Sequence, residues 1–286
     1  MTAVLLALCA ALAYGVSDFL SGTASRLMHY GRVALVCQSV MAVVTWAAVG
    51  FVPGDASMDA LLWGALAGVG SGAGTVMLYR GLGSGQMNVV APLSAATAAV
   101  VPVAFGLITG ERPSVVILLG VVLIVPGIGL ISSVRAQPGG RRRVMKGTVD
   151  GTLAGAAFAI SYIALDGAPS GAGLWPAAYT QLSALAVIAL AAALLIRPAN
   201  RGHAVADGAR RAHVAAVAAG LLGALAVATF LFATDHGLLV VTSVLTSLYP
   251  AATVILARVL LAERTSRAQL VGLTLAAAGI ILVVVG

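Results

Sequence analysis

Ten apolar runs of about 20 residues follow one another along the chain, separated by short polar or glycine- and proline-containing gaps. A run of this length crosses ~30 Å of hydrocarbon as a helix. Backbone groups in lipid must find hydrogen-bond partners within their own segment, so the runs predict helices. We therefore expect an all-α integral membrane protein with spans at approximately 3–21, 32–52, 59–80, 86–108, 114–134, 148–166, 174–196, 213–234, 238–261 and 267–285.

The pattern of residues 111–130 recurs 152 residues later, at 263–282. The two segments, ERPSVVILLGVVLIVPGIGL and ERTSRAQLVGLTLAAAGIIL, match at nine of twenty positions. Their shared skeleton is E-R-x-S, then L-x-G, then L, then G-I-x-L. A repeat of half the chain length governs the whole fold. It predicts two five-helix repeats at 1–134 and 148–286, joined by a basic linker at 135–147.

An odd number of helices in each repeat turns the second copy upside down in the membrane. Glu111 is then expected at the outer face and Glu263 at the inner face. An inverted repeat builds an outward and an inward gate from one pattern, which is typical of secondary transporters.

Composition and charge support this interpretation, because 60% of the 286 residues are hydrophobic and only 9% are charged. The net charge of +7 does not indicate a nucleic-acid partner, since the basic residues lie in short loops. The loops after the odd-numbered spans hold nearly all of these residues, which predicts that they are cytoplasmic and that both termini lie outside. The opposite loops hold only Arg112; the cytoplasmic set is Arg26, Arg32, Arg80, Arg135, Arg141, Arg142, Arg143, Lys146, Arg197, Arg201, Arg210, Arg211, Arg264 and Arg267.

The repeated stretches Gly85–Gly127 and Gly237–Gly279, together with the opening AYGVSDF at residues 13–19, resemble the EamA-type branch of the drug/metabolite transporter superfamily. The resemblance covers nearly the whole chain. It implies a cytoplasmic-membrane transporter that moves small solutes such as amino acids, usually outward. It also implies a central cavity among spans 1, 3, 4, 6, 8 and 9. No cofactor is expected.

Three prolines are expected to interrupt spans and mark gates: Pro92 and Pro102 in span 4, and Pro250 in span 9. The second half has Tyr249-Pro250 where the first has Thr97-Ala98, so the cavity is not symmetric. The polar side chains near these breaks are candidate substrate ligands, namely Asn88, Ser94, Thr97 and Thr246. The alternative is that each hydroxyl bonds its own helix four residues back.

Tyrosines within spans are scarce, and Tyr14, Tyr162 and Tyr249 are expected to face the cavity. Asp18 is the carboxylate that lies farthest inside a span, and ionisable groups in hydrocarbon are functional by default. It is either a substrate or coupling group or a solvated helix end. A proton is therefore a candidate coupling ion, and facilitated transport down a gradient is the alternative.

Catalysis has weaker sequence support. Gly70-Ser71-Gly72 resembles a nucleophile turn, and His236 is a possible base, but no third group is indicated. The histidines are scattered and Cys9 and Cys37 lie alone in apolar runs, so no metal site is expected. The sequence thus predicts an alternating-access exporter of a small polar metabolite such as an amino acid. The alternatives are an exporter of hydrophobic drugs and an intramembrane enzyme.

Overall fold

The computed structural model describes residues 1–25, 27–83, 87–131, 141–195, 206–260 and 266–286. This described part is almost entirely helical. Seven of its helices are long and apolar enough to cross a membrane, judged by length and composition. In chain order the helices are α1 (Thr2–Ser25), α2 (Tyr30–Val49), α3 (Met58–Gly83), α4 (Met87–Thr109), α5 (Val115–Ile131), α6 (Arg141–Asp166), α7 (Trp175–Leu195), α8 (Ala206–Thr234), α9 (Leu239–Thr246), α10 (Tyr249–Leu260) and α11 (Arg267–Val285).

The expected ninth span consists of two helices, because a tighter turn interrupts the α-helical hydrogen bonds at Ser247-Leu248, just before Pro250. There the Leu248 amide bonds the Leu245 carbonyl, three residues back, at 3.2 Å. In contrast, α4 is assigned as one continuous helix through Pro92 and Pro102, so the interruptions expected there are not present. A proline in a helix removes a single backbone hydrogen bond, which a membrane helix tolerates where its neighbours pack closely. The helix α6 begins at Arg141, so residues 141–147 of the expected linker are helical as well.

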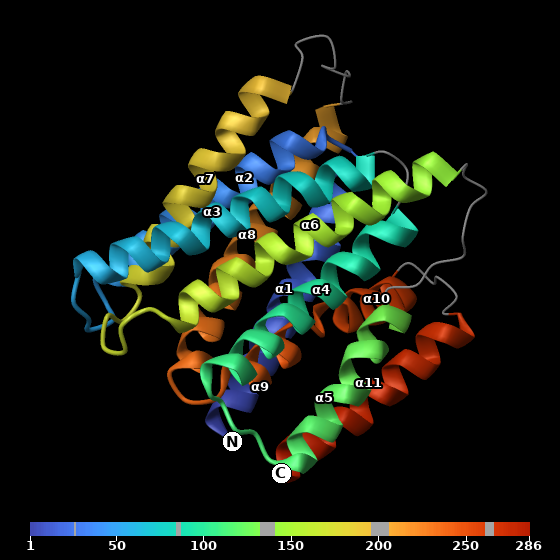
Figure 1. Cartoon of the computed structure of the whole chain (residues 1–286). Helices are drawn as coiled ribbons and strands as arrows, with labels where there is room; N and C mark the ends of the chain where they lie inside the picture. The colour runs from blue at the N-terminus through green and yellow to red at the C-terminus, as the bar shows by residue number, and fades with distance from the viewer. Residues whose placement is uncertain (26, 84–86, 132–140, 196–205, 261–265) are drawn as a thin grey trace.

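The two halves of the chain interleave. The most extensive helix contacts all join one half to the other: α1 with α8, α3 with α6 and α7, and α5 with α11 (Figure 1). Exchanging the halves turns the α1–α8 contact into the α6–α3 contact, as a two-fold relation between repeats requires. The chain is therefore built from two five-helix repeats of opposite orientation.

The repeated glycines show the inversion directly. Gly120 of α5 faces Gly279 of α11, and Gly127 of α5 faces Gly272 of α11, so the two helices run antiparallel. A methyl group added at Gly120 would lie 2.7 Å from the carbonyl oxygen of Gly279, and one at Gly272 would lie 2.8 Å from that of Gly127. Small residues of this kind let helix backbones approach closely in a membrane.

The serine of E-R-x-S begins the last helix of each half. The Ser114 hydroxyl accepts from the Ile117 amide at 3.2 Å, and the Ser266 hydroxyl accepts from the Gln269 amide at 3.2 Å. The side-chain oxygen of Gln269 in turn accepts from the Ser266 amide, which completes a capping box. The motif thus contains a helix N-cap at equivalent places in both repeats.

The glycine-rich helix α3 is closely packed, as its sequence indicates. Gly64, Gly68 and Gly72 lie against α7, while Gly70 and Gly74 lie against α6. A methyl group at Gly70 would lie 2.6 Å from the Ala157 carbonyl oxygen. The Gly-Ser-Gly sequence around Ser71 is therefore explained by helix packing.

Candidate functional site

An accessible carboxylate lies within α1. Tyr14 and Asp18 are four residues apart and share one face of this helix. The Asp18 side chain is exposed, whereas most positions that contact neighbouring helices are buried. The inner face of α1 therefore opens onto accessible space at Asp18 instead of being sealed by its neighbours.

Side chains from three other helices surround this carboxylate. Tyr162 of α6, Tyr249 of α10 and Cys37 of α2 all lie within electrostatic range of Asp18. Tyr14 interacts with Asp18 and with Tyr162. The structure thus brings together four of the residues expected from the sequence; the cluster of Tyr14, Asp18, Tyr162 and Tyr249 is called the tyrosine–aspartate cluster below.

Packing fixes the positions of these tyrosines. Tyr162 is buried and its ring lies 4.7 Å from that of Phe230 on α8, in a tilted arrangement. The start of α10 packs on α1, where the Thr253 hydroxyl donates to the Gly15 carbonyl at 2.9 Å. Phe230 and Cys37 were not among the expected site residues, because nothing in their local sequence marks them.

Most hydroxyls of α9 are satisfied by the backbone. Thr242 and Ser243 bond carbonyls of their own helix, Ser243 to Leu239 at 2.6 Å, so the alternative of local bonding holds for them. The Thr246 hydroxyl instead reaches the Ala7 carbonyl of α1 at 3.5 Å. It joins two helices beside the cluster.

Two hydroxyls lack such partners. Ser94 and Ser247 are fully buried, and neither hydroxyl has a hydrogen-bond partner of good geometry among the described residues. Ser247 occupies the break between α9 and α10 and faces Tyr162. A buried polar group without a partner is costly, so each of these hydroxyls is a candidate for contact with water or a ligand.

The other expected ligands lie on α4. Thr97 is half-buried where α4 packs on α6. A methyl group added at Gly155 of α6 would lie 2.6 Å from the Cβ of Thr97. The neighbouring Ala98 joins the same apolar cluster as Tyr162, which places this part of α4 beside the tyrosine–aspartate cluster. The side chain of Asn88 lies outside the part of the chain that the structure describes.

The glutamate of the first E-R-x-S has a role that its sequence position does not reveal. Its two carboxylate oxygens accept hydrogen bonds from the backbone amides of Leu239 at 2.6 Å and Val240 at 2.9 Å. These are the first two amides of α9, which belongs to the other repeat. A carboxylate at a helix N-terminus satisfies free amides and complements the helix dipole. Glu111 therefore caps a short, fully buried helix across the boundary between the halves.

Two further carboxylates lie near this cap. Asp166, at the end of α6, interacts electrostatically with both Glu111 and Asp235. Asp235 follows α8, and partial burial raises its pKa, while the neighbouring His236 opposes the shift. These acidic residues gather at one end of the bundle and are separate from the tyrosine–aspartate cluster.

The pair proposed for catalysis has other roles. His236 is exposed, and its Nδ1 lies 2.8 Å from the Phe232 carbonyl oxygen of the preceding turn. Ser71 lies within the packed glycine stripe of α3. Neither position suggests a nucleophile and base.

Comparisons with known proteins agree with this architecture. A solved crystal structure, whose title reads only "Crystal structure of protein", superposes with a TM-score of 0.76 over 99% of this chain and 96% of that one. The two sequences are 18% identical, so this likeness concerns the fold. None of the curated proteins matches the sequence. The sequence model of the EamA-like transporter family matches residues 1–133 and again 145–285. The chain therefore belongs to the EamA-like transporter family, a family of multi-pass membrane transporters within the drug/metabolite transporter superfamily.

Proposed function

We propose that the chain exports a small polar metabolite with a protonated amino group, such as an amino acid, by alternating access across the cytoplasmic membrane. The observation that carries this proposal is the accessible Asp18 within α1, surrounded by Tyr14, Tyr162 and Tyr249.

The tyrosine–aspartate cluster suits an ammonium group. A carboxylate inside a membrane span requires a partner, and a charge-assisted hydrogen bond is the strongest that a small solute can offer. Tyrosine rings add attraction through their π faces, and their hydroxyls supply further donors and acceptors. Asp18 would bind the amino group while the three rings enclose it.

The break between α9 and α10 suits the acidic end of the same solute. Helix N-termini carry partial positive charge, and discontinuous helices of transporters use them to bind anionic groups. Here α10 begins at Tyr249, with the buried Ser247 hydroxyl just before it and beside Tyr162. Pro250 has no amide hydrogen and the Ala251 amide bonds the Leu248 carbonyl at 2.8 Å, so Ser247 is the side-chain donor that this helix end offers. An amino acid bound here would place its amino group on Asp18 and its carboxylate at the start of α10.

The inverted repeat supports alternating access, since exchanging the conformations of the halves would move the opening from one side to the other. The direction of transport is proposed to be outward. A proton is the proposed coupling ion, because Asp18 holds either a proton or the amino group of the solute.

Counterflow in proteoliposomes tests the proposal. Proteoliposomes that contain the protein are preloaded with an unlabelled amino acid, and the labelled form is added outside. Uptake of the label is measured for the wild type and for Asp18→Asn. We expect the variant to lose about 10- to 100-fold of its uptake, the range for losing a hydrogen bond between charged groups. Asp18→Glu should recover part of it.

The matched control is Asp59→Asn, which neutralises an exposed carboxylate in the first turn of α3. It should transport as the wild type does. Uptake by Asp18→Asn equal to that of the control would remove Asp18 from the site. Repeating the assay with an imposed pH gradient tests proton coupling. If a proton is the coupling ion, the gradient should drive uptake by the wild type and should not drive uptake by Asp18→Asn.

An exporter of apolar organic cations is the second candidate, because the rings of Tyr162 and Phe230 extend the site with aromatic surface. The first candidate requires a carboxylate on the solute, whereas the second does not. If aromatic amines without a carboxylate exchange as well as amino acids do, this second candidate is correct.

A further inference from the structure

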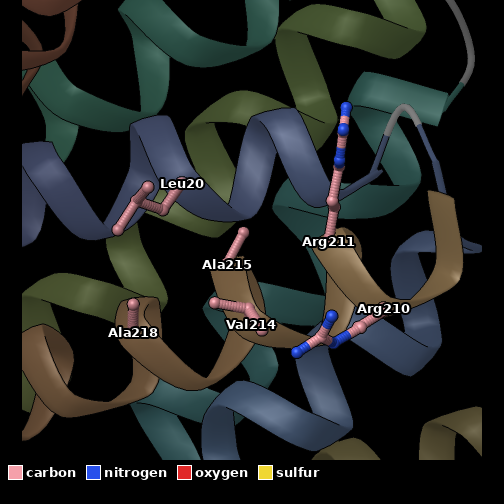
Figure 2. A pocket seen from close by; sticks show the side chains of 6 residues that line it. All are labelled: Leu20, Arg210, Arg211, Val214, Ala215 and Ala218. Carbon is pink, nitrogen blue, oxygen red and sulfur yellow. The ribbon is translucent and has the colours of Figure 1, made fainter. Parts of the chain in front are cut away.

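A groove lies between α1 and α8 (Figure 2). Its volume is about 360 Å³. Leu20 of α1 forms one wall, and Val214, Ala215 and Ala218 of α8 form the other. The groove is apolar along its length and ends at two adjacent basic residues, Arg210 and Arg211.

The groove continues into an exposed apolar stripe. On α8, Val214, Leu221 and Leu225 recur at helical spacing and are 63%, 49% and 48% exposed. On α1, Leu12 is 59% exposed and lies two turns before Leu20, on the same side of the helix. Large apolar side chains exposed along two neighbouring membrane helices face the acyl chains of lipids.

The two helices are packed together beside the groove. The Ser17 hydroxyl donates to the Ala219 carbonyl at 2.8 Å, which holds the two helices together beside the groove. Ala24 and Ala212 are fully buried in one apolar cluster with residues of α2. None of the residues that line the groove belongs to the tyrosine–aspartate cluster.

The two arginines supply charge at the end of this apolar surface. Both side chains are exposed, and neither forms an ion pair with another residue that the structure describes. A membrane topology signal requires only that basic residues lie in the loops. It does not require that two consecutive arginines, whose side chains point in different directions from α8, line the end of an apolar groove (Figure 2).

We propose that this groove binds an anionic phospholipid of the leaflet on the arginine-rich side of the protein. The phosphate and the additional acidic group interact with Arg210 and Arg211. One acyl chain lies against Leu20 and Ala218 and continues along the exposed stripe of α8. The lipid therefore contacts α1 only two residues from Asp18, although on another face of the helix.

Native mass spectrometry of the purified full chain tests this proposal by titration with phosphatidylglycerol and with phosphatidylcholine of identical acyl chains. The wild type should bind phosphatidylglycerol more tightly. Arg210→Gln combined with Arg211→Gln should weaken that binding about thirtyfold, to the level of phosphatidylcholine, because each cation near a membrane surface contributes about fivefold. Replacing both arginines with lysine should retain most of it.

Two further variants separate a specific groove from general surface charge. Arg267→Gln with Lys146→Gln removes two exposed cations that the topology places on the same side, outside the groove. This variant should bind within twofold of the wild type. Ala218→Leu fills the apolar wall and should weaken binding while both arginines remain. Equal affinity of the wild type for the two lipids, or equal losses in the two double variants, would overturn the proposal.

Discussion

Glu111 shows how one side chain links the two repeats. Its carboxylate binds the first two amides of α9, and its neighbour Ser114 begins α5. In the first copy of E-R-x-S, both the glutamate and the serine are therefore helix caps, and neither contacts the tyrosine–aspartate cluster through these bonds; Glu263 of the second copy lies outside the residues that the structure describes. The repeat could be recognised from the sequence, but the partner of Glu111 could not. That partner lies 128 residues away and becomes visible only when the halves are packed together.

Neutralising Glu111 should destabilise the protein. Glu111→Gln keeps one acceptor oxygen but loses the negative charge and the second acceptor for α9. A hydrogen bond to a charged group contributes about 1.5–3 kcal/mol, so we expect the apparent Tm in detergent to fall by about 3 °C or more. Thermal unfolding followed by tryptophan fluorescence measures this.

Asp59→Asn is the control, since Asp59 is an exposed acidic residue in the first turn of α3. A Tm for Glu111→Gln equal to that of the control would mean that the cap contributes nothing to stability.

At the scale of helices, the hydrophobic runs predicted the positions of the helices well. The prolines predicted the interruptions within the helices less well. The positions of the spans follow from apolar length, because a membrane leaves the backbone no other choice. The interruption near Pro250 was expected, whereas those at Pro92 and Pro102 are absent because α4 remains helical through both. A proline permits a break, but neighbouring helices decide whether it occurs. Tyr14, Asp18, Tyr162 and Tyr249 were singled out because such residues are rare within spans, but that they lie close together, with Cys37 and Phe230 beside them, required tertiary contacts.

The packing of α5 on α11 gives a prediction with an internal control. Gly127→Val places a side chain against the Gly272 carbonyl, where even a single added carbon would lie 3.0 Å away. Overpacking of this kind costs about 1–3 kcal/mol, so the apparent Tm should fall by several degrees.

Gly129 lies on the same helix two residues later and has open space around it. Gly129→Val should therefore leave the Tm within about a degree of the wild type. Similar losses for both variants would indicate a general effect of valine on α5 instead of a contact between the repeats.

At the scale of the whole molecule, both chain ends lie at the same end of the bundle (Figure 1). The C-terminal residue lies against the first repeat, where the Ser114 hydroxyl donates to the Gly286 carbonyl at 3.4 Å. Charge in the loops predicts that this end faces outward.

Cysteine labelling in intact cells tests that orientation. In a background with Cys9→Ser and Cys37→Ser, Asp55→Cys should react with a membrane-impermeant maleimide. Lys146→Cys should react only after the cells are permeabilised. The reverse pattern would invert the proposed topology and place the arginine-rich loops outside.

The interleaving of the halves has a consequence for how the protein is made. Helices of the first repeat find their largest partners in the second, so α1, α3 and α5 enter the membrane before the surfaces that they bind exist. The repeats are 152 residues apart, which at ribosomal speeds of 5–20 residues per second is a wait of about 8–30 s. During that interval the glycine-lined and polar faces of the nascent first half must be sheltered by lipid or by the insertion machinery.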